Sequence, residues 1–171
     1  MVIYIGADHR GFDLKKYLKG VLMQMGYTVV DVGNEVFDEN DDYPDFARMV
    51  GGKVSLDYEN SRGILLCSSG VGVSVVANKF PNVRAACAAS PDQAFDSRND
   101  DNANVLCLAV NYLEPDEAKK IVTTWIQTPF SGEERHKRRL QKISDIETEV
   151  ASREEVKPRF GQVNPWKPEN Q

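Results

Sequence analysis

The sequence predicts an α/β protein: a five-stranded parallel sheet covered by helices on both faces. Three observations predict it. Short apolar runs alternate with longer segments whose apolar residues recur at helical spacing. The apolar runs contain almost no polar residues, as expected of strands buried on both faces. Strands and helices follow one another at the spacing of βαβ units, which build parallel sheets.

Each predicted element has a local reason. The strands are short runs dominated by Val, Ile, Leu, Ala and Cys. In the first helix, apolar residues recur three or four positions apart, and Gly26 follows as a C-terminal cap. Pro44 stands near the start of the second helix, where proline is favoured. In chain order the elements are strand 2–5, helix 12–25, strand 28–32, helix 45–56, strand 63–67, a helix ending at Lys79, strand 83–88, helix 93–98, strand 105–110, helix 114–127 and helix 133–149.

The length of 171 residues suits one domain with a single core, which we assign to residues 1–150. From Arg153 onward the chain becomes polar and rich in proline, so we assign 151–171 as a C-terminal tail. Phe160 and Trp166 in this tail either dock on a surface or belong to a loosely ordered end.

Composition excludes several classes of function. The net charge of −5 gives no general attraction to nucleic acid, although residues 135–139 form a basic cluster. No apolar run approaches the roughly 20 residues that span a bilayer, and the N-terminus lacks the pattern of a secretory signal. The three cysteines lie in or beside apolar runs, which indicates free thiols in a reducing compartment. We therefore expect a cytoplasmic protein that binds neither membrane nor nucleic acid.

Ligands of open parallel sheets bind beyond the carboxyl ends of the strands. This rule selects residues 6–11, residues 67–72 and, less directly, residues 97–104. In residues 68–72, SSGVG, two glycines let the backbone turn sharply at a predicted helix start, so several N–H groups favour an anion such as phosphate. The loop completes neither a dinucleotide fingerprint, because Val75 takes the third glycine position, nor a Walker loop. The alternative is a tight turn that only joins two elements.

Cys67 lies at the junction of strand and loop, where a helix N-terminus lowers the pKa of a thiol. A cysteine phosphatase would need an arginine six positions later, where this chain has Val73, and a redox pair would need a second cysteine close by in the sequence. The role of general base therefore survives best. The alternative, a buried inert thiol, fits Cys87 and Cys107, which lie inside apolar strands.

Three further residues are candidate ligands of a phosphate. His9 follows Asp8 at the end of the first strand, and Arg135 and Arg139 stand four apart on one helical face. The alternatives are a surface loop for His9 and a solvated helix face for the two arginines.

These motifs together resemble the family of ribose-5-phosphate isomerase type B and galactose-6-phosphate isomerase, most closely the ribose-5-phosphate branch. The resemblance runs from residue 2 to about residue 149. The matching segments, in chain order, are GADHRG (6–11), DYP (42–44), CSSGVG (67–72), ANK (77–79), VRA (83–85), NANVL (102–106) and RH (135–136) with Arg139.

The resemblance implies a three-layer α/β/α fold that is Rossmann-like or flavodoxin-like but binds no nucleotide, and it implies neither cofactor nor metal. It implies a homodimer or tetramer with active sites at the subunit interface. The implied reaction is aldose–ketose isomerisation of a phosphosugar through a cis-enediolate, with ribose 5-phosphate as the leading substrate, in pentose phosphate metabolism. Cys67 is the implied base, and Val73 occupies the position of the glutamate base found in other members.

The remaining roles also come from the resemblance. Ser69 assists catalysis, and the loop 68–72 forms the anion hole. His9, Arg135 and Arg139 hold the phosphate. The other implied contacts to substrate are Asp8, Tyr43, Ser68, Gly70, Val71, Gly72, Ser74, Asp101 and Asn102.

The chain departs from the family pattern in three places. Asp100 stands where a ring-opening histidine is usual, Asn111 replaces a common arginine, and Ser68-Ser69 replaces Gly-Thr. Asp100 or Asp101 opens the sugar ring, or the substrate reacts in open-chain form, or it has no ring. The alternatives to ribose 5-phosphate are galactose 6-phosphate, allose 6-phosphate or a tetrose phosphate. A non-catalytic sugar-phosphate-binding module, or one subunit of a hetero-oligomeric isomerase, are further alternatives.

Overall fold

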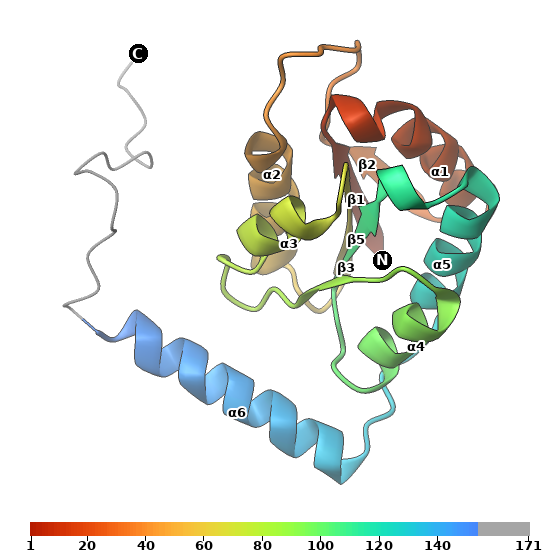
Figure 1. Cartoon of the computed structure of the whole chain (residues 1–171). Helices are drawn as coiled ribbons and strands as arrows, with labels where there is room; N and C mark the ends of the chain where they lie inside the picture. Colours follow the sequence, from red (N-terminus) through yellow and green to blue (C-terminus); the bar gives the residue numbers. More distant parts are fainter. Residues whose placement is uncertain (154–171) are drawn as a thin grey trace.

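The computed structural model describes residues 1–153 and contains the predicted parallel sheet (Figure 1). The strands are β1 Val2–Ala7, β2 Thr28–Asp31, β3 Ser61–Cys67, β4 Ala85–Cys87 and β5 Val105–Ala109. The α-helices are α1 Phe12–Gln24, α2 Tyr43–Leu56, α3 Val71–Ala77, α4 Pro91–Asn99, α5 Pro115–Gln127 and α6 Glu134–Ala151. Short 3₁₀ helices, His9–Gly11 and Val110–Tyr112, follow β1 and β5.

All strand pairs are parallel, and the strand order is β2-β1-β3-β5-β4. The flavodoxin-like order would place the fourth strand beside the third. Here β5 pairs with β3 instead, so β4 becomes the outer strand. Because every strand points the same way, the sheet has one amino edge, where strands begin, and one carboxyl edge, where they end.

Apolar side chains of β3 alternate between two cores, which explains why this strand is apolar throughout. Ile64 and Leu66 face the layer of α1, α4 and α5, where the fully buried Trp125 packs. Leu65 and Cys67 face the layer of α2 and α3. The prediction of a three-layer α/β/α fold is therefore confirmed.

Two boundaries differ from prediction for local reasons. The fourth strand is predicted over 83–88 but is shorter, since the Arg84 N–H bonds the side-chain oxygen of Asn104 rather than a neighbouring strand. The fourth helix is predicted over 93–98 but begins at Pro91, because Ser90 accepts the N–H of Gln93 as an N-cap.

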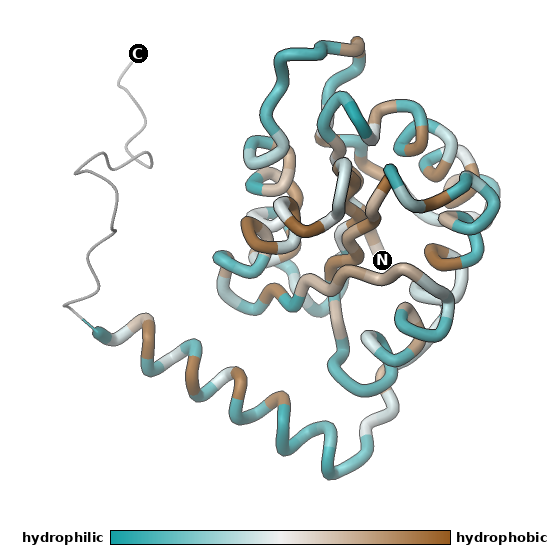
Figure 2. The backbone as a smooth tube through the Cα atoms, in the orientation of Figure 1, coloured by the Kyte–Doolittle hydropathy of each residue, from teal (hydrophilic) through white to brown (hydrophobic). Residues whose placement is uncertain are grey.

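Helix α6 extends away from the body along the amino edge, on the side opposite the loop before α2 (Figure 1). Hydrophobic residues recur at intervals along this mostly hydrophilic helix (Figure 2). Among them, Ile143, Ile146 and Val150 are about half exposed. Within residues 1–153, no helix is long and apolar enough to cross a membrane. Most of the predicted tail, residues 154–171 with Phe160 and Trp166, lies outside the described residues.

Candidate active site

The carboxyl edge brings the first two predicted stretches together. Ala7 of β1 pairs with Leu66 of β3, so Asp8 and Cys67, one position further along, lie at neighbouring strand ends. Cys67 is also the register partner of Ala109 on β5. The ends of β1 and β3 thus deliver polar groups to one place beside the end of β5, as the strand-end rule predicts.

The glycine loop is built around Gly70, which has a positive φ of 73° and caps α3. Glycine adopts this left-handed conformation without the steric cost that a side chain brings. The turn directs the Gly70 N–H onto the Sγ of Cys67 at 3.2 Å. This contact holds the Cys67 sulfur at the carboxyl edge, where the predicted base is needed.

Neighbouring residues fix the shape of the loop. A Cβ on Gly72 would lie 2.8 Å from the ring of Tyr43, so glycine lets Tyr43 approach the start of α3 closely. The side-chain amide of Asn111 donates to Ser68 Oγ at 2.7 Å, and Ser74 Oγ donates to the Val71 carbonyl at 2.8 Å. Ser69 Oγ is exposed and lies 3.4 Å from the Val71 nitrogen.

His9 is held by a residue that sequence reasoning missed. Asp41 Oδ1 accepts the backbone N–H of His9 at 2.8 Å and also lies 2.8 Å from its ring Nδ1. Asp41 is itself held by the side chain of Asn34 at 3.1 Å. The acidic loop before Tyr43 was the only available signal, and it did not indicate which carboxylate turns inward.

Asp8 is buried and caps the 3₁₀ turn by accepting the N–H groups of Arg10 and Gly11. Burial raises the pKa of Asp8 above its ordinary value, against the opposing effect of these hydrogen bonds. A carboxyl whose pKa is raised on folding destabilises the fold in its ionised form, and this penalty disappears as the pH falls through the folded pKa.

We therefore expect Asp8→Asn, which keeps the accepting oxygen, to raise the melting temperature at pH 8 by a few degrees. The gain should shrink as the pH is lowered from 8 through the folded pKa of Asp8, because the wild-type carboxyl then becomes neutral as well. Calorimetric melts of both proteins across this pH range check the prediction. A gain that is constant with pH would contradict it.

The prediction that Cys87 is a buried inert thiol is wrong, whereas Cys107 is fully buried as predicted. Cys87 is exposed because β4 is the outer strand, and its sulfur lies 3.2 Å from the Gly70 carbonyl oxygen. A hydrogen bond from Cys107, in register on β5, lowers the pKa of Cys87 to about 6. Cys87 is thus a second thiol beside the loop and a rival to Cys67.

The remaining predicted residues lie at the amino edge, away from Cys67. Asp100, Asp101 and Asn102 lie shortly before β5, and Arg135 and Arg139 lie on the first turns of α6.

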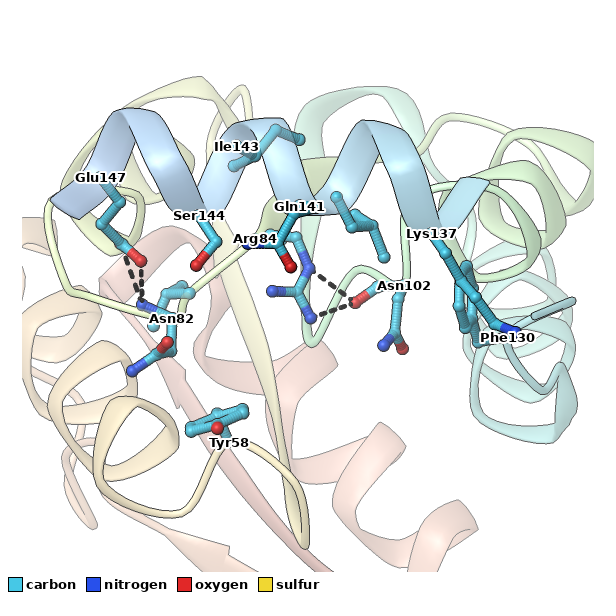
Figure 3. A pocket seen from close by; sticks show the side chains of 12 residues that line it. Tyr58, Asn82, Arg84, Asn102, Phe130, Lys137, Gln141, Ile143, Ser144 and Glu147 are labelled. Carbon is cyan, nitrogen blue, oxygen red and sulfur yellow. Dashed lines mark hydrogen bonds between the residues drawn. The ribbon is translucent and has the colours of Figure 1, made fainter. Parts of the chain in front are cut away.

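Figure 3 shows how α6 lies over this edge: Glu147 accepts the Asn82 N–H, and Arg84 donates to the Asn102 carbonyl. Arg135 pairs with Glu133 at 2.8 Å. The predicted site residues of one copy of the chain therefore fall into two groups, called half-sites below, at opposite edges of its sheet.

The same edge contains the hollows formed by α6. A cavity of about 380 Å³ lies between α6 and the turns around Arg84 and Asn102 (Figure 3). A larger groove of about 730 Å³ runs between Ile143, Ile146 and Val150 of α6 and the outer strand β4. In residues 1–153, no group of His, Cys, Asp and Glu side chains is arranged to hold a metal ion.

The structure has a parallel sheet with a glycine-rich loop and a helix start at its carboxyl edge. This arrangement is typical of α/β proteins that bind a small anionic ligand at that edge. A family model described as Ribose/Galactose Isomerase matches residues 3–143. The chain belongs to this family.

Individual proteins of this family are similar to the chain over most of its length. The probable ribose-5-phosphate isomerase B of Mycoplasma genitalium is 44% identical over 148 residues, covering 86% of this chain and 97% of the relative. A crystal structure of ribose-5-phosphate isomerase B from that organism, with bound ribulose-5-phosphate, superposes with a TM-score of 0.84 at 44% identity, covering 86% of this chain and 97% of that one. The D-erythrulose-4-phosphate isomerase of Pectobacterium atrosepticum is 38% identical over 130 residues, covering 76% of this chain and 85% of the relative.

Proposed function

We propose that this chain is an aldose–ketose isomerase that interconverts ribose 5-phosphate and ribulose 5-phosphate. The observation that carries the proposal is the Cys67 thiol held by the Gly70 N–H at the carboxyl edge, in a family whose solved member with bound ribulose-5-phosphate is 44% identical to this chain. The free thiols fit a reducing, cytoplasmic compartment.

In this mechanism the Cys67 thiolate removes the C2 proton of the open-chain aldose. The electron pair forms the C1=C2 bond, and the negative charge that develops on O1 is stabilised by N–H groups of the loop 68–72. Cys67 then returns its proton to C1, while the Ser69 hydroxyl passes the O2 proton to O1. The net change is one hydrogen moved from C2 to C1 and one from O2 to O1, with no cofactor.

The two half-sites require a second copy of the chain. We propose a homodimer in which His9 and Cys67 of one subunit face Arg135 and Arg139 of the partner subunit, so that the partner's arginines complete the phosphate site. The apolar stripe of α6, the groove beside it and the exposed Val71 and Val75 of α3 supply apolar surface for such an interface. Pairing of dimers into a tetramer remains a further expectation.

A tetrose phosphate is the second candidate substrate, because one relative is a D-erythrulose-4-phosphate isomerase. That relative matches a smaller share of this chain at lower identity than the ribose-5-phosphate isomerase B does. Ribose 5-phosphate is therefore the better-supported substrate.

Incubation of the purified chain with ribulose 5-phosphate in D₂O tests the proposal. We expect one C1 hydrogen of the ketose to be replaced by deuterium while ribose 5-phosphate forms, because the base exchanges its proton with solvent between the two transfers. Proton NMR measures both processes in one sample. Saturable binding without deuterium uptake would indicate a binding module, and turnover of erythrose 4-phosphate alone would indicate the second candidate.

A further inference from the structure

Asp100 lies beside a buried histidine, and the mechanism above uses neither residue. Asp100 Oδ1 accepts the side-chain amide of Asn99 at 2.7 Å. The Nε2 of His136 lies 3.6 Å from the same oxygen. His136 is fully buried, whereas the Asp100 side chain is 40% exposed. A solvent-facing carboxylate is thus supported from behind by an imidazole from α6.

The partners of His136 determine which ring nitrogen carries the proton. Ser131 Oγ lies 2.7 Å from Nδ1, and it also accepts the backbone N–H of Glu133 at 3.3 Å. A hydroxyl that accepts from Glu133 has its own proton free for Nδ1. When this hydroxyl donates to Nδ1, the ring carries its own proton on Nε2, the nitrogen that faces Asp100.

Nε2 makes no hydrogen bond within residues 1–153, although it is buried. A buried N–H without a partner destabilises a fold, so such groups usually have a functional reason. The separation of 3.6 Å from Asp100 is a contact that closes with a small shift of the carboxylate, and hydrogen bonds of this kind commonly tighten when substrate binds.

We propose that His136 is a positioning residue that, with Ser131, orients Asp100 as the base that opens the furanose ring of the substrate. The inference rests on the proposed isomerase function, and it assigns Asp100 rather than Asp101 to this step. Asp101 is exposed, and its backbone carbonyl accepts a hydrogen bond from the Arg84 side chain.

The step balances without any co-reactant but water. The Asp100 carboxylate takes the proton of the anomeric hydroxyl, the C1=O1 carbonyl forms, and the C1–O4 bond breaks. O4 takes a proton from water, and the protonated Asp100 neutralises the resulting hydroxide. The open-chain aldose is then ready for proton abstraction by Cys67 of the other subunit in the proposed dimer.

Two substitutions of His136 separate positioning from packing. Glutamine places an amide N–H near the position of Nε2, whereas asparagine places its amide near Nδ1 and leaves Asp100 without a donor. We expect His136→Asn to lower kcat/KM for ribose 5-phosphate on the order of 10-fold, and His136→Gln to restore most of it. Asp100→Asn should lower it by at least about 100-fold. Ser131→Ala, at an exposed position, should reproduce the loss seen with His136→Asn.

The matched control is deuterium uptake at C1 of ribulose 5-phosphate. This ketose cannot close a furanose ring, because its O5 carries the phosphate, so the exchange contains no ring-opening step. We expect the His136 and Ser131 variants to keep wild-type exchange. With Asp100→Asn, ribose 5-phosphate consumption should also stop rising with enzyme concentration, because spontaneous ring opening then limits it.

Equal loss of exchange and of ribose 5-phosphate turnover in the variants, or equal behaviour of His136→Asn and His136→Gln at unchanged melting temperature, would overturn the inference. If His136→Asn does not fold, Ser131→Ala and Asp100→Asn decide it by the same two assays. Absence of exchange in the wild type would instead overturn the isomerase proposal, and this inference with it.

Discussion

Replacing Cys67 with alanine is expected to abolish proton transfer while leaving phosphosugar binding almost unchanged. The thiol is the only group we assign to the C2 proton, so turnover and C1 deuterium uptake should fall by at least about 1000-fold. Binding should persist with a dissociation constant within about threefold of wild type, because the anion-binding donors of the loop are backbone N–H groups. Isotope exchange and calorimetric titration with ribulose 5-phosphate measure the two effects.

Cys87→Ala is the matched control, since its sulfur also contacts Gly70 and its pKa of about 6 makes it the rival thiolate. We expect this variant to keep activity within about tenfold of wild type, losing only one contact that supports the loop. The reverse ranking, in which Cys87→Ala is inactive and Cys67→Ala active, would move the base from β3 to β4.

Two inactive variants with defects in different half-sites are expected to restore activity when they are coexpressed. Cys67→Ala damages the carboxyl edge and Arg139→Ala damages the amino edge, so a mixed dimer contains one intact site and one with both defects. Random pairing makes half of the dimers mixed, which predicts recovery of about one quarter of wild-type activity. The measurement is the isomerase rate of the coexpressed pair against each variant alone.

Coexpression of Arg135→Ala with Arg139→Ala is the control for this experiment. Both defects lie on the amino-edge half, so every site of a mixed dimer carries one of them and no activity should return. Equal behaviour of the two pairs, or a monomeric mass by light scattering together with full activity, would show that one copy completes its own site.

Much of the fold follows from local sequence. The alternation of apolar runs with helical patterns gave the order of strands and helices, since each βαβ unit is specified by its own periodicity. Gly70 gave the turn, because only glycine takes its left-handed conformation freely. Cys67, Asp8 and His9 were predictable as neighbours because parallel strands end at one edge.

Other contacts depend on residues far apart in the chain. The carboxylate of Asp41 reaches His9 across 32 positions, and no local pattern separates it from the other acids of its loop. His136 looked like part of a solvated basic cluster but is fully buried, because α6 is anchored there against Ser131 and the end of α4.

The sequence by itself therefore determined the elements, their parallel arrangement and the glycine turn at the start of α3, all of which depend on neighbouring residues. Only the tertiary structure decided that β5 lies inside and β4 outside, which exposes Cys87. It also decided that Asp100 and Arg139 lie at the edge of the sheet opposite to Cys67. These outcomes depend on which strands pair and where a helix leaves the body, and such long-range packing leaves no periodic signal in a single sequence.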